Sequence, residues 1–290
     1  MKLILSRKGF DSQSGGCPSP IFPNGTIYSQ PIPDNREKFD SKITYKDLRH
    51  DDTNIGKVVE DLTRNRISSN CPAHLDPDIN RSAYSPRKKG WRPLFGQTGT
   101  AQSHLENEDV RIGDLFLFFG LFQKVEKTSG RWGFVKNAPK QHILWGWLQI
   151  GEVHKVDGLA KDEFLWARYH PHFSPLPKVS NNTLYIASDR LNLGDGPIAP
   201  GAGCFPEFHH RLVLTNPKGS GATDWRLPRC FYPDDGKTPL SYHGNCNWKP
   251  NDGYVYVQRR GPGQEFVLDL AQYPGVTDWL VQSIFNHVKK

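Results

Sequence analysis

The sequence lacks the features that would place the protein outside the cell or in a membrane. Its five cysteines are spread along the chain and form no Cys-x-x-Cys pair, so we expect no disulfide framework and a reducing cytoplasm. The apolar run near the N-terminus, residues 3–5, is too short for a signal peptide. No stretch approaches the roughly 20 apolar residues that a membrane-spanning helix needs. The sequence therefore predicts a soluble, cytoplasmic protein with no membrane partner.

The signatures of the common enzyme classes are also missing. The chain contains no Walker loop, no GxGxxG after a strand, no GxSxG and no HExxH. The cytidine deaminases need a Pro-Cys-x-x-Cys in addition to a His-x-Glu, and the chain contains no Pro-Cys-x-x-Cys. The sequence therefore contains no complete signature of the usual nucleotide-binding, hydride-transfer, serine-hydrolase, zinc-protease or deaminase enzymes.

Basic residues and aromatic side chains are plentiful. Lys and Arg number 37 against 30 Asp and Glu, which gives a formal net charge of +7. Eight tryptophans and an aromatic content of 12% accompany this charge. A basic, aromatic-rich surface suits a polyanionic partner such as DNA or a nucleotide, although a charge of this size also serves solubility alone.

The composition favours short strands and ordered loops over a helical bundle. Gly (27) and Pro (23) are frequent, and aliphatic-rich helical stretches are few. We expect an α+β fold with a mixed, mostly antiparallel sheet or a partly closed barrel, long Gly/Pro-rich loops and a C-terminal helix. With no internal repeat and no clear linker, residues 1–290 are predicted to form a single domain.

Hydrophobic patterning locates the main elements of this fold. The apolar run at 115–122 predicts a strand buried on both faces. Further strands are expected at 3–5, 131–135, 143–154 and 183–187, a strand or turn at 266–269, and helices at 55–62, 162–169 and 276–288. Residues 225–228 are predicted to begin a short helix or a turn.

The first candidate site is the turn that follows residues 3–5, SRKGFDSQSGG. Arg and Lys side chains pair with phosphate, glycines allow close backbone approach, Phe10 could stack on a base, and Asp11 could act as a base. The alternative is that Arg7 and Asp11 only pair with each other and the glycines only make turns. We expect Asp11 to be catalytic and the turn to bind substrate through Arg7, Lys8, Gly9, Phe10, Ser12, Gly15 and Gly16.

The second candidate is the motif His74-x-Asp76-x-Asp78. Alternate side chains of an extended segment share one face, so the three could converge on a substrate or a metal. Cys71 precedes His74, but no second cysteine pair completes a zinc site. We therefore predict catalytic roles for His74 and Asp76 and assign no metal; the alternative is a solvated turn.

The third candidate is His243, which lies between small and polar residues in a predicted loop. It could form an acid–base pair with Glu265 or Asp76, although spacing alone does not establish proximity. Gln264 and Glu265 complete the predicted substrate-binding set, with His243 as a further catalytic residue. The histidines that flank Pro171 have the pattern of surface turn residues.

Aromatic and basic residues also interleave around the predicted hairpin of residues 131–154. Such sets bind single-stranded nucleic acid or flipped bases, but alternate residues of a strand enter the core, which favours packing roles. The set is Trp132, Phe134, Lys136, Lys140, His142, Trp145 and Trp147.

The motif LSRKGFDSQSGGCPSPIFPNG resembles the start of the nucleotide modification associated domain family, the third of a numbered set. The likeness continues through AHLDPDI, GDLFLFFGLF, GWLQIGEV, NTLYIAS and GQEFVLD, and so covers nearly the whole chain. It implies base hypermodification of DNA or of a nucleotide precursor in phages or bacteria, with other enzymes of a modification pathway as partners. It points to Arg7, Lys8, Asp11, Ser12, His74 and Asp76, without individual roles and without a named cofactor.

A looser resemblance links GDLFLFFGLF and HILWGWLQIGEV to the barrel core of PUA-like domains. This likeness implies an alternative function, a non-catalytic reader of modified or single-stranded nucleic acid. Whether the protein is an enzyme stays open at this point. The enzyme alternative is a nucleobase- or nucleotide-modifying transferase, and its cofactors are unknown.

Overall fold

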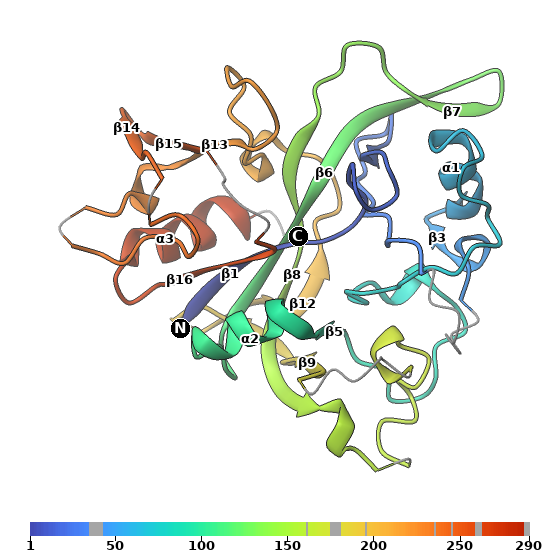
Figure 1. Ribbon diagram of the computed structural model, residues 1–290, viewed down its shortest axis with the longest axis horizontal. Helices are drawn as coiled ribbons and strands as arrows, with labels where there is room; N and C mark the ends of the chain where they lie inside the picture. The colour runs from blue at the N-terminus through green and yellow to red at the C-terminus, as the bar shows by residue number, and fades with distance from the viewer. Residues whose placement is uncertain are drawn as a thin grey trace.

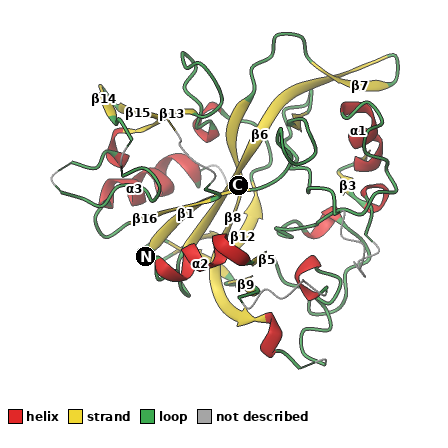
Figure 2. Ribbon diagram, in the orientation of Figure 1, coloured by secondary structure: helices red, strands yellow, loops and turns green. Residues whose placement is uncertain are grey.

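The computed structural model describes residues 1–34, 43–160, 162–174, 181–194, 196–234, 236–244, 246–258 and 263–286 (Figure 1, Figure 2). A nine-stranded mixed sheet runs through the middle of the molecule, with shorter elements on either side (Figure 2). The expected α+β class with a mostly antiparallel sheet is confirmed, and the described strands close no barrel.

The central sheet has the order β16-β1-β6-β8-β9-β5, and β2 and β7 pair with β6 while β12 pairs with β8. β1 and β2 lie parallel to β6, and the other pairs are antiparallel. The strands of this sheet are β1 (Lys2–Arg7), β2 (Ser19–Ile21), β5 (Leu94–Gln97), β6 (Leu115–Thr128), β7 (Arg131–Phe134), β8 (Gln141–Lys155), β9 (Thr183–Ala187), β12 (Ala202–Cys204) and β16 (Glu265–Asp269).

The long strands β6 and β8 form the centre of the core. Their apolar residues are buried on both faces over most of the shared length, as the continuous hydrophobic run predicts. Phe116 and Phe118 stack on each other on one face, with ring centroids 5.9 Å apart, while Phe119 contacts Trp225 at 5.2 Å. β1 is apolar and fully buried from Leu3 to Leu5 and pairs with β6. Its last residue, Arg7, is half-buried, so the turn that follows begins at the edge of the core.

Smaller elements flank the sheet, with α1 on one side and β13–β15 with α3 on the other (Figure 1). The additional strands are β3 (Arg49–His50), β4 (Thr53–Asn54), β10 (Arg190–Asn192), β11 (Pro197–Pro200), β13 (Asp224–Pro228), β14 (Lys249–Asn251) and β15 (Tyr254–Gln258). The helices are α1 (Ile55–Leu62), α2 (Gly99–Asn107), α3 (Pro274–Trp279), the 3₁₀ turns η1 (Tyr45–Asp47), η2 (Arg81–Ala83), η3 (Val156–Gly158), η4 (Pro171–Phe173), η5 (His210–Leu212) and η6 (Arg229–Phe231), and the π-helical η7 (Leu280–Ile284).

Most predicted elements occur at their predicted positions. The strands expected at 3–5, 115–122, 131–135, 143–154 and 183–187 correspond to β1, β6, β7, β8 and β9, the strand or turn at 266–269 is the strand β16, and the helix at 55–62 is α1. The C-terminal helix is present as α3 and η7, while its predicted last residue, Val288, lies outside the described residues. No described helix combines the length and apolar character required to cross a membrane.

Two local predictions are wrong. Residues 162–169 form turns instead of a helix, and Phe164 there has φ +50°, a left-handed conformation that interrupts a right-handed helix. Residues 224–228 form β13 instead of a helix or turn, because Trp225 and Leu227 alternate into the core while the strand pairs with β15.

Three segments that are distant in the sequence meet beside β5. The turn that follows β1 lies on one side. The chain around Asp78 is bound to β5 through the backbone bonds Asp78 N to Leu94 O and Leu94 N to Asp78 O. η4 comes shortly before β9, which pairs with β5. The fold thus places polar side chains from all three segments at one end of β5.

Candidate functional site

A cavity of about 220 Å³ lies where these segments meet. Two of the three sequence-predicted groups line it, the turn after β1 and the His74–Asp76 segment, together with residues near the end of β5 and in η4. The predicted residues in its wall are Arg7, Lys8, Gly9, Asp11, His74, Asp76 and Gln264. Other wall residues, which sequence reasoning did not assign, include Gly96, Gln97, Thr98 and His172.

The turn after β1 depends on glycine where the chain passes closest to its neighbours. Gly9 has φ +94°, and a Cβ there would lie 2.2 Å from Ser29 Oγ. Gly15 has φ +85°, and a Cβ there would lie 2.4 Å from the ring of Phe10. These positions therefore require glycine for backbone conformation and packing. Ser12 is exposed and, like Gly15 and Gly16, is not in the cavity wall.

Phe10 is a core residue in this structure. It is 0% exposed, covered by Gly15, and its ring meets Tyr45 edge-on with centroids 6.1 Å apart. No face of the ring is open to a base, so the predicted stacking role is wrong for this conformation. The Phe10 amide donates to Gln30 O, and this hydrogen bond fixes the turn to the neighbouring segment of the same chain.

Arg7 and Asp11 pair with each other, as the simpler alternative foresaw, at 3.3 Å between Nη1 and Oδ2. Asp11 Oδ1 accepts hydrogen bonds from the amides of Gln13 and Ser14. Both oxygens of this carboxylate are thus engaged within the turn, although both side chains still line the cavity. The geometry favours a structural role for Asp11 over a catalytic one.

Lys8 is neutralised by a buried carboxylate. Its Nζ donates to Glu265 Oε1 at 2.9 Å and lies 4.6 Å from the centre of the Phe95 ring. Gln97 Nε2 donates to the same oxygen at 2.6 Å. Glu265, 1% exposed, is therefore the partner of Lys8 and not a residue of the cavity wall, while the backbone carbonyl of Gln264 accepts from Arg7 N at 2.8 Å.

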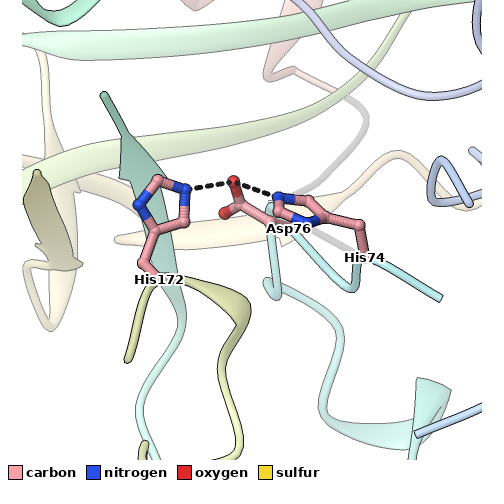
Figure 3. Close-up of side chains that lie close together, drawn as sticks. All are labelled: His74, Asp76 and His172. Atoms are coloured by element: carbon pink, nitrogen blue, oxygen red, sulfur yellow. Dashed lines mark ion pairs between the residues drawn. The ribbon is translucent and has the colours of Figure 1, made fainter. Parts of the chain in front are cut away.

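The densest group of chemical side chains is the His–Asp cluster, which we define as His74, Asp76 and His172 (Figure 3). Both imidazoles turn a ring nitrogen toward the same carboxylate oxygen (Figure 3). Nε2 of His74 lies 3.8 Å from Asp76 Oδ2, and Nε2 of His172 lies 3.5 Å from it. The His74 side chain is 20% exposed and the other two are 6% exposed, so the cluster is accessible mainly beside His74.

Each imidazole of the His–Asp cluster is held through its other nitrogen. His74 Nδ1 lies 3.1 Å from the buried carboxylate of Asp34, and His172 Nδ1 lies 2.6 Å from Asn182 Oδ1. Asn182 Nδ2 donates to the backbone carbonyl of His172, which fixes the orientation of its amide. Because carboxylate and amide oxygens accept, each Nδ1 carries a proton, and Nε2 is the atom left to contact Asp76.

Asp76 is anchored on its other oxygen. Oδ1 accepts from the Gly96 amide at 2.9 Å and lies 3.2 Å from His170 Nε2. Burial alone would raise the pKa of Asp76, but contacts with the imidazoles of His170 and His172 hold that pKa well below its usual range. Burial lowers the pKa of His170 by more than the contact with Asp76 raises it. Asp76 is thus an ionised carboxylate at neutral pH beside a neutral His170.

Asp78 does not join the His–Asp cluster, contrary to the expectation that all three residues of the motif converge. Its oxygens accept from both terminal nitrogens of Arg87, each at 2.6 Å, and from the Tyr169 hydroxyl. Trp91 Nε1 donates to the same hydroxyl at 2.7 Å. This network joins the chain around Asp78 to the residue before His170, and so holds the two halves of the cluster together.

His243 lies apart from the cavity, inside the hydrophobic core. It is 0% exposed, its ring stacks on Trp225 with centroids 5.9 Å apart, and it meets Phe266 edge-on with centroids 5.2 Å apart. Its Nδ1 lies 2.9 Å from Ser241 O. The predicted pairing with Asp76 or Glu265 in a shared cleft is therefore not seen, because the loop folds onto the core instead of the cavity.

The histidine that completes the cluster was not assigned from the sequence. His172 was interpreted as a surface turn residue, yet it is 5% exposed. Only the tertiary fold brings it to Asp76. The sole local signal is the pattern His-Pro-His, which is typical of a turn and does not by itself indicate a site.

A larger cavity of about 390 Å³ shares Gly9 and Asp76 with the first. Tyr28 and Trp145 line it. Both are mostly buried, and the indole nitrogen of Trp145 has no hydrogen-bond partner within the described part of the chain. Trp147 packs in the core and donates to Pro200 O. Of the aromatic set in the central hairpin, only Trp145 faces this cavity.

Comparison with known proteins gives one family. The family model described as nucleotide modification associated domain 3 matches residues 2–269. No curated protein and no solved structure gives a significant match. A PUA-like core therefore stays a prediction.

Proposed function

The chain belongs to the nucleotide modification associated domain 3 family, and from this membership and the site geometry we propose that it is an enzyme that modifies a nucleobase, in DNA or in a nucleotide precursor. One observation carries the proposal: the turn after β1 and the His–Asp cluster line a single cavity. Partly exposed cationic and carboxylate groups there stand beside oriented imidazoles, which is the arrangement that proton transfer requires.

The cavities suit a nucleotide in size and lining. The cavity beside the His–Asp cluster, which we call the inner cavity, has a volume of about 220 Å³. It is smaller than the roughly 300–1,000 Å³ of pockets for drug-sized ligands. It therefore accommodates a base or the reacting part of one. The adjoining cavity of about 390 Å³ offers Tyr28 and Trp145 as apolar surfaces.

His74 is the residue best placed to move a proton. Asp34 holds its Nδ1–H and leaves Nε2 as a base that faces the cavity, which is the Asp–His relation used in general-base catalysis. The Asp76 carboxylate stabilises the imidazolium that forms. Arg7, 20% exposed beside Asp11, is the cation in the wall that a substrate phosphate can approach.

The test is mass spectrometry of nucleosides from cells that express the gene with its neighbours. DNA and the free nucleotide pool are digested separately, so that the two substrate classes are distinguished. We expect a new nucleoside with the wild type, and a loss of about 10²–10⁴-fold with His74→Gln or Asp76→Asn. His210→Ala, which removes an exposed imidazole outside the cavity, is the matched control and should retain the product.

Identical nucleoside profiles with the wild type and with an empty vector, in both fractions, would contradict the proposal. Equal product from the wild type and Asp76→Asn would place the chemistry elsewhere in the chain. A product present only in the nucleotide pool would identify the precursor as substrate.

A further inference from the structure

We propose that the His–Asp cluster is a binding site for a divalent first-row transition-metal ion. His74, Asp76 and His172 each offer one ligand atom, and all three atoms lie within 4.8 Å of one another. The site is inferred from ligand geometry alone. As a cofactor for nucleobase chemistry, the metal also rests on the proposed function. A bound ion would take the Nε2 lone pair of His74, so that in the metal-bound protein a water on the ion, and not His74, would be the base.

The spacing of the ligand atoms is close to what a shared ion requires. At 3.5 and 3.8 Å, the two Nε2–Oδ2 separations are long for hydrogen bonds. Two ligands that each bind a metal at roughly 2.1 Å are separated by about 3.0–3.4 Å at octahedral or tetrahedral angles. Shortening each Nε2–Oδ2 separation by a few tenths of an ångström would bring both pairs into this range, and the two imidazole nitrogens lie within 4.8 Å of each other.

Every ligand has the supporting contact that metal-binding residues need. Asp34 fixes His74 through Nδ1, Asn182 fixes His172 through Nδ1, and the Gly96 amide fixes Asp76 through Oδ1. The first two contacts direct the lone pairs of both Nε2 atoms toward Asp76 Oδ2, and the third leaves that oxygen available. Such outer contacts set the tautomer and orientation of ligands in metal sites.

The backbone next to the cluster is shaped to the imidazole of His172. A Cβ on Gly96 would lie 2.3 Å from Cδ2 of His172, so only glycine lets the ring lie directly against β5. The same residue supplies the amide that holds Asp76. Gly96 therefore positions two of the three ligands.

The ligand set indicates the class of metal. Two imidazole nitrogens and one carboxylate oxygen suit Fe²⁺, Mn²⁺, Co²⁺ or Zn²⁺, whereas Ca²⁺ and Mg²⁺ prefer oxygen ligands. Three protein ligands leave coordination positions vacant. All three residues line the inner cavity, so a water molecule or the substrate could occupy these positions. This inference departs from the metal-free site expected from the sequence, where only cysteine pairs and local spacing could be assessed.

The test is titration of the untagged full-length protein with Co²⁺ after removal of bound metals by chelation. Binding is followed by visible absorption and by calorimetry. We expect one Co²⁺ per chain in the wild type and in His210→Ala, and affinity weakened at least 100-fold in His172→Ala and Asp76→Asn. Asp34→Asn, which changes only an outer contact, should weaken binding by about 10–100-fold.

Folding is checked separately by circular dichroism and by the melting temperature. Co²⁺ should raise the melting temperature of the wild type and leave that of Asp76→Asn unchanged, because only a folded site binds the ion. Wild-type binding no tighter than that of His172→Ala would overturn the metal site, whatever the nucleoside analysis shows. Tight binding without a new nucleoside would instead leave the metal site standing and count against the proposed function.

Discussion

Asp76 and Asp78 are two residues apart, both have nearly buried side chains, and their surroundings differ completely. Asp78 meets the guanidinium of Arg87 through two hydrogen bonds and also accepts from Tyr169. Asp76 meets three imidazoles and one backbone amide. Asp78 lines the cavity of about 390 Å³, but its side chain is 0% exposed and its charge is paired within the protein. Asp76 and the imidazoles of His74 and His172 line the cavity of about 220 Å³, and no arginine or lysine pairs with Asp76 among the described residues.

The difference lies in the partners and not in the carboxylates. A guanidinium is permanently charged and only donates, so its pairing with Asp78 is a closed structural unit. An imidazole can be neutral, can accept a proton and can bind a metal through its lone pair. Asp76 is therefore the member of the pair available for chemistry, and Asp78 holds the two chain segments that carry the imidazoles.

The largest expected effect comes from Arg87→Leu. Removing the guanidinium leaves Asp78 as a buried carboxylate without its counter-charge, and we expect a loss of about 3–5 kcal/mol in the free energy of unfolding. Denaturation in urea measures this loss. Arg81→Leu, which replaces an exposed arginine of the same region, is the control. Its guanidinium lies 5.5 Å from the centre of the Trp91 ring, so its loss should lower the free energy of unfolding by at most about 1 kcal/mol.

The double variant Asp78→Leu/Arg87→Leu sharpens this test. Because both charges are removed together, it should be more stable than the single variant. A single Arg87→Leu variant within 1 kcal/mol of the wild type would show that Asp78 is not the closed structural unit inferred here.

A smaller effect, confined to the His–Asp cluster, is expected from Gly96→Ala. The new methyl group would meet His172, with a Cβ–Cδ2 separation of 2.3 Å, and would displace the ring. Overpacking of this kind lowers the free energy of unfolding by about 1–3 kcal/mol. The Co²⁺ affinity should also fall by about 10–100-fold. Calorimetry measures the Co²⁺ affinity of Gly96→Ala and of the control variant Gly133→Ala, where a Cβ meets nothing within 4 Å. Unchanged Co²⁺ affinity in Gly96→Ala would contradict the positioning role.

Much of the fold could be predicted because it depends on local pattern. The apolar runs of β6 and β9 are readable in short windows, and α1 shows its buried face in one turn after another. The strand β13 alternates between buried and half-buried residues, but it is only five residues long and becomes a strand by pairing with β15. α2 buries only Gln102 and Leu105, which is too little pattern for a sequence-based prediction.

The site could be predicted only in part, for a physical reason. The period of two correctly brings His74 and Asp76 to one face, since that relation is local. His172, Asp34 and Asn182 reach the cluster through strand pairing and loop packing, which no spacing in the sequence encodes. The same kind of tertiary contact decides that the Asp78 carboxylate pairs with Arg87 and does not join the His–Asp cluster.

The smallest effect is expected from Asp11→Asn, in the turn that looked most like a binding site from its sequence. The substitution retains Oδ1 as the acceptor for the Gln13 and Ser14 amides and removes the charge that faces Arg7. A partly exposed ion pair contributes about 0–1 kcal/mol, so the melting temperature and the nucleoside product should both be nearly those of the wild type. Asp11→Ala, which also loses the two turn bonds, should be less stable by about 1 kcal/mol more. Loss of product in Asp11→Asn with its stability intact would move the catalytic carboxylate from Asp76 to the opening turn, because the two share one cavity wall and only one of them is closed off by its own amides.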